Sequence, residues 1–391
     1  MISKFKTEID STFLLFGFTF FSGSMLVGRI VAESLSLYEA LLCFLLGGFI
    51  LGSISGVLAY ISSSLNKDLV ELVSLFFGKY GKNFILFLIA LTQIGWFGIG
   101  ASMFSIPFSD EFFHGSSFSY ILLTYAFGIL MLISAAGGIN FLTKLSYIAV
   151  PVILILGLCG TIKAVNNIDL FQFVLKKGEL SISNGVSLVV GSYIAGSLLT
   201  PNFTYLSKRP LTVSICAFSA FCIGNGLMLI FGAVSYYLIG GSDIFDLFRY
   251  FDLLLFGFIC LGLNIWSSCD NGLYSASLCI HSLTRINRKK IVIFVGVISI
   301  IFSPILYKYF LNILVFLNSL LPPIGIMFIF NYLFFKNSLT IELKINLFIL
   351  FVVEIVSCLS IGEKNFIGFF FCSAIYAIIF VYHKYVKHLV Q

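Results

Sequence analysis

Long runs of apolar residues without charge constrain this chain more than any other feature of its sequence. A helix needs about 20 consecutive apolar residues to cross the hydrocarbon core of a bilayer, and such runs follow one another from residue 11 to residue 386. Charged residues make up 10% of the chain, whereas soluble domains carry roughly a quarter. Because backbone polar groups in lipid must be paired internally, the sequence predicts an all-α integral membrane protein.

Turn residues and charges divide the apolar runs into about twelve predicted spans. The longest connection, 165–185, is too short to hold a hydrophobic core of its own. We therefore expect residues 1–391 to form a single membrane domain. The predicted spans are 11–33, 38–63, 83–107, 118–136, 142–164, 186–203, 211–239, 249–281, 291–307, 309–335, 341–361 and 365–386.

Lysine and arginine residues are distributed unevenly between the two sides of these spans. Sixteen lie in segments that are cytoplasmic if the N-terminus is inside, six lie in the outer segments, and Arg29 lies within a span. This excess predicts that both termini are cytoplasmic. The net charge of +6 thus reflects topology and does not indicate nucleic-acid binding. The nine cysteines are scattered singly, which indicates neither a zinc site nor a disulfide framework.

Small residues and a proline interrupt two of the predicted spans. Glycine and serine are poor residues for a helix interior, and proline removes a backbone hydrogen bond. Broken helix in a membrane is tolerated only where it lines a cavity, although a small-residue packing face is the alternative interpretation. The interrupting residues are Ser22, Gly23, Ser24 and Gly28 in the first span and Gly191, Ser192, Gly196, Ser197 and Pro201 in the sixth.

Each interrupted span opens a block of five spans. Residues 11–164 form the first predicted block, residues 186–335 form the second, and residues 341–386 add two further helices. Interruptions at corresponding positions of two halves are typical of transporters built from an inverted repeat, with the binding site near the middle of the membrane. The halves show no residue-by-residue similarity, so this symmetry is inferred from placement alone.

Five small polar side chains share one face of the eighth predicted span. On a wheel of about 100° per residue they fall within roughly 60° of the first of them. Such side chains can bind an alkali cation together with carbonyls freed by a broken helix, or they can simply pack helices together. Asp270 lies off this face and is either a functional acid or a structural one bonded to a neighbouring span. The five residues are Asn264, Ser267, Ser268, Asn271 and Ser275.

The third predicted span places an amide and an indole on one helical face. Gln93 and Trp96 are three residues apart, so their side chains project to the same side. Tryptophan offers a stacking plane and glutamine offers a donor and an acceptor, which suits a flat heteroaromatic ring. Trp96 lies near the centre of the span, which argues against an interfacial anchor. Tyr193, in the interruption of the sixth span, is predicted to give the opposing plane.

Six ordered blocks of sequence carry a resemblance that extends over nearly the whole chain. The blocks are GFTFFSGSM (17–25), TQIGWFGIGASMFSIP (92–107), LVVGSYIAGSLLT (188–200), FCIGNGLMLIFGA (221–233), LGLNIWSSCDNGLYSASL (261–278) and LPPIGIMFIFNYL (321–333). In these blocks the chain resembles the bacterial cytosine permeases of the nucleobase–cation symport family. The resemblance implies the leucine-transporter fold, a five-plus-five inverted repeat with two additional helices, and uptake coupled to sodium or, in some branches, to protons.

The resemblance implies a substrate site built around the amide and the indole. Gln93 and Trp96 match the family's substrate amide and stacking indole. Tyr193 stands where cytosine permeases carry phenylalanine as the second stacking ring, and Ala195 stands where they carry serine. Ser22 and Ser192, from the two interruptions, are also assigned to this predicted substrate site.

The resemblance implies a sodium site as well. Asn264, Ser267 and Ser268 match an Asn-x-x-Thr-Thr motif, with serine replacing threonine twice, so the ligating hydroxyls are kept. The backbone carbonyls of Phe21 and Ser24 match the side of the site formed by the first span. Cys269 replaces an asparagine beside the motif, and this departure, like those at Tyr193 and Ala195, leaves the exact substrate open.

These observations together predict a secondary transporter rather than an enzyme. It is expected to import a nucleobase, cytosine first, by sodium symport through alternating access in the bacterial inner membrane, as a monomer in the lipid bilayer and with no cofactor beyond the coupling ion. The alternatives are a proton-coupled carrier of another nucleobase or a hydantoin-like ring, a channel, and a non-transporting sensor. The four histidines are spread apart in loops or near the C-terminal end, so no catalytic constellation is indicated.

Overall fold

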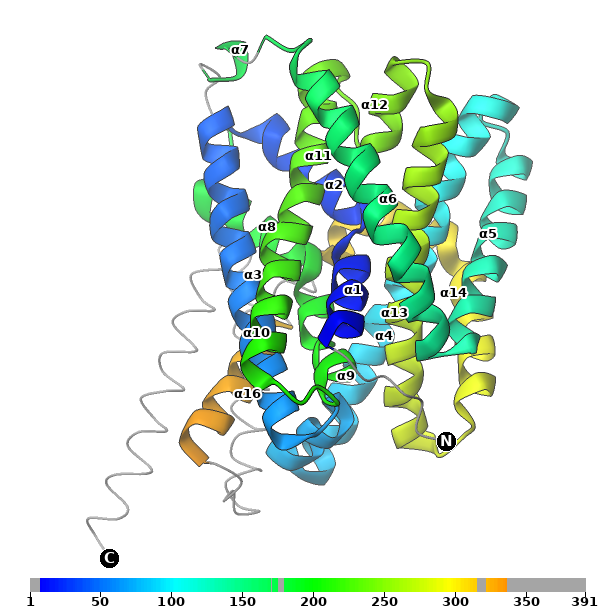
Figure 1. The fold of residues 1–391 in the computed structure, drawn as a ribbon. Coiled ribbons are helices and arrows are strands. Elements are labelled where there is room, and N and C mark those ends of the chain that lie inside the picture. The colour runs from blue at the N-terminus through cyan, green and yellow to red at the C-terminus, as the bar shows by residue number, and fades with distance from the viewer. Residues whose placement is uncertain (1–7, 170, 175–178, 315–320, 336–391) are drawn as a thin grey trace, which may run out of the picture.

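The computed structural model describes residues 8–169, 171–174, 179–314 and 321–335, and their regular secondary structure is entirely helical. Figure 1 shows most of these helices running along one direction, as expected for spans of a bilayer. The predicted spans 341–361 and 365–386 lie outside the described residues. The described part therefore bears on the first ten predicted spans, and the count of about twelve stays a prediction.

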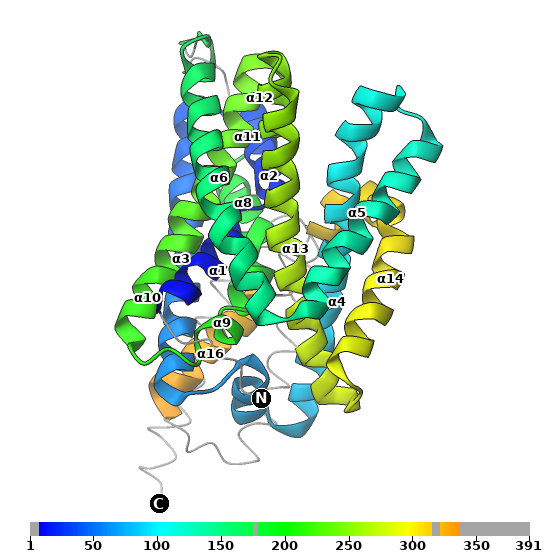
Figure 2. The same ribbon diagram turned by 45° about the vertical axis from the view of Figure 1, so that its right-hand side comes forward.

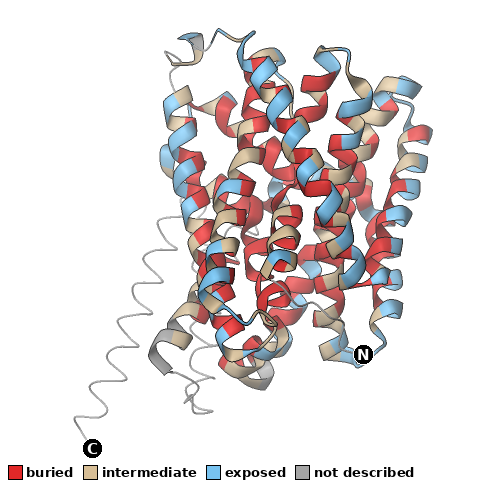
Figure 3. Cartoon of the chain, viewed as in Figure 1, coloured by how far each residue is buried: buried red, intermediate tan, exposed pale blue. Residues whose placement is uncertain are grey.

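Six helical segments in the described ranges are long and apolar enough to cross a membrane, and the bent pair at the N-terminus makes a seventh. Large apolar side chains lie exposed on their outer faces, such as Phe49, Ile148 and Phe294. Figure 3 shows buried residues in the interior and exposed ones around the outside. Since soluble proteins rarely expose contiguous apolar surface of this extent, these faces fit lipid. The six segments are α3 (Leu37–Leu65), Gly81–Phe113 within α4 (Leu69–Phe113), α5 (Ser117–Gly137), α6 (Ile139–Val165), Pro210–Tyr250, and α14 (Arg288–Lys308).

The first predicted span is broken, but at two phenylalanines rather than at its small residues. Helix α1 (Glu8–Thr19) ends before Phe20, helix α2 (Ser22–Ser34) begins after Phe21, and the two helices are bent by 50°. Residues Ser22 to Ser24, predicted to form the interruption, instead make the first turn of α2. The break leaves carbonyls at the end of α1 without partners from the continuing helix.

The sixth predicted span differs from expectation because its helix continues through the glycine and serine residues. Helix α8 (Ile182–Leu198) is regular past Gly191 and Gly196, and the break comes at residues 199–200, before α9 (Pro201–Thr204). Pro201 explains this position, since a proline ring clashes with the carbonyl four residues earlier. That carbonyl, of Ser197, accepts hydrogen bonds from the backbone N–H and the hydroxyl of Thr200 at 3.2 and 2.8 Å.

The seventh and eighth predicted spans also differ in detail. The seventh contains a π-helical turn, η1 (Ala220–Gly224), between α10 (Pro210–Ser219) and α11 (Asn225–Ile239). The eighth was predicted to begin at residue 249, but that residue belongs to the short helix α12 (Ile244–Tyr250). The long helix α13 (Leu254–Thr284) follows, and a further short helix, α7 (Phe171–Val174), lies on the same side as α12 (Figure 1). In the tenth predicted span, residues 310–314 and α16 (Pro322–Phe335) are helical.

The helices form two groups that pack more extensively within themselves than against each other. We call α1, α2, α3, α8, α10 and α11 the bundle, and α4, α5, α13 and α14 the scaffold. The strongest pairings are α2 with α11 and α3 with α8 and α10 in the bundle, and α4 with α13 and α14 in the scaffold. Helix α6 bridges the groups by packing on α1 and α13. Figure 2 shows the scaffold helices α4, α5 and α14 set apart from α3 and α10.

Candidate functional site

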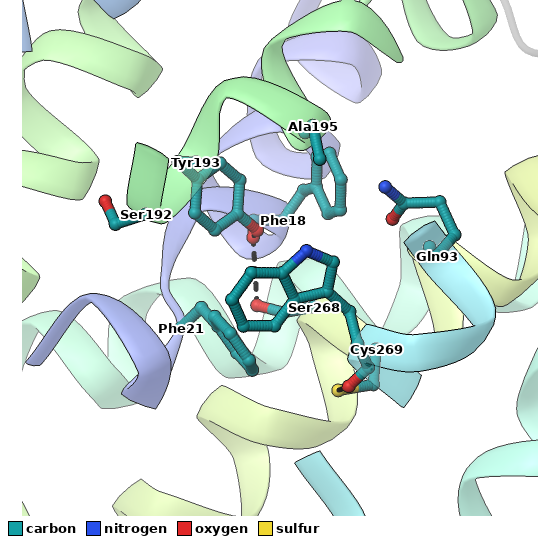
Figure 4. A pocket seen from close by; sticks show the side chains of 11 residues that line it. Phe18, Phe21, Gln93, Ser192, Tyr193, Ala195, Ser268 and Cys269 are labelled. Atoms are coloured by element: carbon teal, nitrogen blue, oxygen red, sulfur yellow. Dashed lines mark hydrogen bonds between the residues drawn. The ribbon is translucent and has the colours of Figure 1, made fainter. Parts of the chain in front are cut away.

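A pocket lies between the bundle and the scaffold, next to the break between α1 and α2. The space between its walls measures about 350 Å³, part of which is open to solvent. Its walls come from α8, α4, α13 and the broken span, so no single helix forms it. The lining residues are Phe18, Phe21, Gln93, Trp96, Ser192, Tyr193, Ala195, Gly196, Ser268, Cys269 and Gly272, and Figure 4 shows most of them.

Gln93 and Trp96 both line this pocket from α4, as their spacing predicts. The Gln93 side chain is 3% exposed, and its one hydrogen bond within the described residues is a long one of 3.4 Å from Nε2 to the hydroxyl of Thr92. Its carbonyl oxygen is therefore free to accept, and its amide is free to donate, toward a bound molecule. A buried amide of this kind favours a ligand that satisfies it.

Aromatic rings surround the indole rather than leaving a single open stacking slot. The ring of Phe21 meets Trp96 edge-on at 5.6 Å between centroids and meets Tyr193 at 6.2 Å. Phe310 lies 5.7 Å from Trp96, also edge-on. Phe21 was predicted only as a backbone ligand, so its ring is a pocket wall that the sequence reasoning missed. Phe18, which meets Tyr193 at 5.4 Å, was missed as well.

The remaining predicted substrate residues divide between two places. Ser192 and Ala195 line the pocket, but the Ser192 hydroxyl donates to the carbonyl of Val189 at 2.7 Å, and Figure 4 shows it directed away from Gln93. Ser22 does not line this pocket. It lies in a neighbouring cavity, and its buried hydroxyl has no partner among the described residues.

Two hydroxyls of α13 meet the carbonyls freed at the end of α1. The Ser267 hydroxyl donates to the carbonyl of Gly17 at 2.9 Å. The Ser268 hydroxyl lies 2.9 Å from the carbonyl of Phe18 and 2.6 Å from that of Phe20. These five oxygens form what we call the carbonyl–hydroxyl cluster. Its carbonyls come earlier in the chain than the predicted Phe21 and Ser24, because the helix breaks earlier than expected.

Asn264 and Ser24 lie toward α11 instead. The amide nitrogen of Asn264 is 3.3 Å from the sulfur of Met228, and its oxygen has no partner within the described ranges. The Ser24 hydroxyl donates to the side-chain oxygen of Asn225 at 2.6 Å, and the Ser24 N–H donates to the carbonyl of Phe21 at 3.0 Å. In this conformation, two of the five predicted cation-site residues, Ser267 and Ser268, belong to the cluster.

Asp270 is fully buried against α5 rather than facing the pocket. One carboxyl oxygen lies 3.0 Å from the hydroxyl of Ser134, and the other has no partner in the described part of the chain. The Ser134 oxygen also accepts the indole N–H of Trp266 at 2.8 Å and lies 2.7 Å from the carbonyl of Met131. Asp270 thus ties α13 to α5 within the scaffold.

A larger cavity of about 670 Å³ adjoins Ser22 on the side of α12. It was not predicted, because its acidic residues come from segments between spans. Asp243 caps α12 by accepting from the N–H of Phe245 at 2.8 Å. Arg249 forms an ion pair with Glu111 of α4 at 3.1 Å. The lining residues are Ser22, Leu26, Met103, Ile106, Pro107, Asp110, Ser242, Asp243, Phe245, Asp246, Arg249 and Tyr307.

Some known proteins are similar to this chain in sequence, and others are similar to it in the arrangement of their helices. Residues 8–344 match the family described as permeases for cytosine/purines, uracil, thiamine and allantoin. The cytosine permease of Escherichia coli K12 is 35% identical over 331 residues, covering 84% of this chain and 78% of that protein. The cytosine permease of Escherichia coli O157:H7 matches to the same extent.

Solved structures of low sequence identity share the fold. Mhp1, a nucleobase-cation-symport-1 family transporter in a closed conformation with bromovinylhydantoin bound, has a TM-score of 0.78 at 15% identity, covering 97% of this chain and 93% of Mhp1. A Na⁺-coupled sialic acid symporter in a substrate-bound outward-open state has a TM-score of 0.69 at 14% identity, covering 96% and 90% of the two chains. The fold is therefore the leucine-transporter type expected from the resemblance.

Proposed function

The chain belongs to the family of permeases for cytosine/purines, uracil, thiamine and allantoin, and we propose that it imports a nucleobase together with sodium by alternating access. Cytosine is the first candidate substrate. The observation that carries the proposal is the contact between two sites: Ser268 both lines the substrate pocket and belongs to the carbonyl–hydroxyl cluster. Ion and substrate would therefore bind on opposite sides of one short stretch of broken helix.

The pocket supports a flat heteroaromatic substrate. Stacking of a base on an aromatic ring contributes about 1–3 kcal/mol in other base-binding proteins, and here Trp96 and Tyr193 supply the rings. Gln93 supplies the hydrogen-bonding edge. A site whose polar groups pair with the edge of a base rejects rings that lack matching polar groups. The number of unpaired polar groups in the pocket therefore determines which base it binds. The departures at Ala195, Tyr193 and Cys269 therefore bear directly on which ring fits.

The carbonyl–hydroxyl cluster supports an alkali cation as the coupling ion. Carbonyl and hydroxyl oxygens are hard ligands, and a monovalent ion needs no carboxylate among them. In the described residues the hydroxyls of Ser267 and Ser268 are bonded directly to the carbonyls of Gly17, Phe18 and Phe20. A cation between these oxygens would separate α13 from the end of α1 and orient the break. Sodium would thereby shape the wall of the substrate pocket.

The two helix groups support transport by rocking of the bundle against the scaffold. The pocket lies at their boundary, and the larger cavity lies on the α12 side of the same boundary. Basic residues such as Lys208, Arg209 and Arg285 lie between spans at the opposite end, and under the positive-inside rule they support a cytoplasmic position for that end. We accordingly place the protein in a bacterial inner membrane with both termini inside, and the proposed site requires only one copy of the chain.

Substrate binding to purified protein tests this proposal most directly. Thermal shifts over a panel of nucleobases and hydantoins, with sodium or with choline as the cation, would identify the ligand and its ion dependence. We expect cytosine to stabilise the protein mainly in the presence of sodium, since a ligand that binds only the folded state raises its stability. Stabilisation by no base under either condition would contradict the proposed function.

Proton coupling is the second candidate, and Asp270 is the observation that favours it. An unpaired charged carboxylate within a membrane is costly, so the buried Asp270 is expected to be neutral in this conformation. Uptake into proteoliposomes would separate the candidates. A sodium gradient without a pH gradient should drive cytosine uptake under the sodium proposal. Uptake that responds only to the pH gradient, and is lost in Asp270→Asn, would favour the proton.

A further inference from the structure

Tyr193 contacts both the substrate pocket and the carbonyl–hydroxyl cluster. Its ring lines the substrate pocket, and its hydroxyl donates a hydrogen bond to the backbone carbonyl of Phe18. The same carbonyl is 2.9 Å from the hydroxyl of Ser268 in the carbonyl–hydroxyl cluster. Figure 4 shows the side chains of Tyr193 and Ser268 directed toward this point from α8 and α13. No other side chain of the described pocket both presents an aromatic ring to the substrate space and bonds a cluster carbonyl.

We propose that Tyr193 couples cation binding to substrate binding, because its hydroxyl and the cation compete for the Phe18 carbonyl. This inference rests on the proposed sodium-coupled function and assigns the residue that links its two sites. A phenol O–H and a cation both bind a carbonyl oxygen through positive charge, and a carbonyl offers two lone pairs. Because the hydroxyls of Tyr193 and Ser268 both lie against the Phe18 carbonyl, a cation that binds there must displace one of them. The Ser268 hydroxyl lies 2.9 Å from the Phe18 carbonyl and 2.6 Å from the Phe20 carbonyl, which are hydrogen-bond distances and leave no room for an ion between these oxygens.

The two hydroxyls in contact with Phe18 differ in how they can respond to an ion. Ser268 lies within reach of three carbonyls, so its single proton can turn to another acceptor while its oxygen ligates the ion. The Tyr193 hydroxyl has the Phe18 carbonyl as its acceptor, and its oxygen can move only with the whole ring. Displacement of this hydroxyl by a cation therefore requires the aromatic ring itself to shift.

The ring of Tyr193 is closely packed, so its displacement changes the pocket. It lies edge-on to Phe18, Phe21 and Phe221 at 5.4, 6.2 and 5.7 Å between centroids. A Cβ added at Gly196 would lie 2.4 Å from its Cε1 atom, so the ring rests directly on the backbone of α8. Since these neighbours leave the ring little free space, a shift that takes its hydroxyl off the carbonyl also moves the stacking surface offered to the substrate. The substrate in turn would hold the ring away from the carbonyl and favour the ion, as reciprocal linkage requires.

The substitution Tyr193→Phe tests the proposal, because it keeps the ring and removes only the hydroxyl. Sodium titrations without substrate, followed by tryptophan fluorescence or thermal shift, give the sodium midpoint. Binding of radiolabelled cytosine with sodium or choline gives the factor by which sodium raises cytosine affinity. We expect Tyr193→Phe to lower the sodium midpoint by about two- to tenfold, the effect of removing one competing hydrogen bond, and to reduce the coupling factor.

Tyr120→Phe is the matched control. Tyr120 also forms a hydrogen bond, to Ser102 at 2.7 Å, but this bond joins α4 to α5 away from the pocket. Its removal should leave both the sodium midpoint and the coupling factor unchanged. An unchanged sodium midpoint in Tyr193→Phe would overturn the inference, and so would a raised midpoint, which would make Tyr193 a ligand rather than a competitor. A wild-type protein without any sodium response would instead overturn the proposed function, and the inference with it.

Discussion

At the scale of single residues, Trp96 is the side chain whose loss should affect substrate binding most. Trp96→Ala removes the indole from the pocket wall while leaving the carbonyl–hydroxyl cluster on the other side of the broken helix. We expect cytosine affinity to fall by about 1–3 kcal/mol, the range found for loss of a stacked base. Equilibrium binding to purified protein measures this change. Trp266→Phe is the control, since Trp266 bonds Ser134 outside the pocket, and equal losses in both variants would contradict the assignment.

The hydroxyls of Ser267 and Ser268 should determine the response to sodium. Replacing both by alanine removes two predicted ligands without changing the aromatic walls. We expect the double variant to lose about 1.5–3 kcal/mol of sodium binding, a magnitude typical of interactions with charged groups. Sodium titration of cytosine binding measures it. Ser277→Ala is the matched control on the same helix, because the buried Ser277 hydroxyl bonds the carbonyl of Tyr274 within α13. A wild-type sodium midpoint in the double variant would refute the cation site.

The sequence predicted pocket side chains better than it predicted backbone ligands. Gln93 and Trp96 follow from helical spacing, and both line the pocket. The carbonyls of Gly17, Phe18 and Phe20 were not predicted, because a carbonyl is the same in every residue and becomes free only where a helix ends. The predicted ligands Phe21 and Ser24 lie just beyond that point. Their roles in binding remain predictions, to be tested with the serine variants.

At the scale of helices, α2 and α11 cross with their backbones almost in contact. A Cβ added at Gly28 would lie 2.0 Å from the carbonyl oxygen of Leu229, and one at Gly232 would lie 1.8 Å from that of Met25. The hydrogen bond from Ser24 to Asn225 joins the same pair of helices. Two short sequence motifs thus pack against each other reciprocally, so we expect the half-helix beyond the break to move together with α11.

Gly232→Ala should destabilise the protein because its methyl group forces this crossing apart. Overpacking of this kind costs about 1–3 kcal/mol, and a lowered melting temperature in detergent would report it. Gly226→Ala is the control within α11. An added Cβ there meets nothing within 4 Å, so the better helix propensity of alanine should leave stability equal or higher, by up to about 1 kcal/mol. Equal melting temperatures for the two variants would show that the crossing tolerates separation.

Helix positions were predicted well, whereas helix interruptions were predicted only in part. Spans 38–63, 118–136, 142–164 and 291–307 correspond to single helices within a few residues at either end. The glycine and serine residues indicated the break in the first span approximately, but the break that they predicted in the sixth span was misplaced. In α8 these residues allow close packing, and Pro201 ends the helix. The π-turn in the seventh span has no comparable local signal, because it depends on packing against neighbouring helices.

At the scale of the whole molecule, the proposed orientation places the α12 side outside. Ser117→Cys, at the start of α5, should react with a membrane-impermeant thiol reagent on intact cells, because this exposed residue lies on the α12 side. Ile286→Cys, between α13 and α14, should react only after permeabilisation. Mass spectrometry of the labelled peptides distinguishes these sites from the native cysteines. The opposite pattern would invert the topology inferred from lysine and arginine residues.

In the proposed mechanism, the break after α1 would serve two purposes with different parts of the same residues. The carbonyl of Phe18 faces the proposed ion site, while its ring lines the pocket. Every amino acid carries the same carbonyl, so substitutions at this position can alter the shape of the pocket without removing an ion ligand. Such an arrangement would allow the substrate specificity to change during evolution while the coupling ion stays the same. Descendants of one ancestral carrier can thereby acquire new substrates while they keep the gradient that powers their uptake.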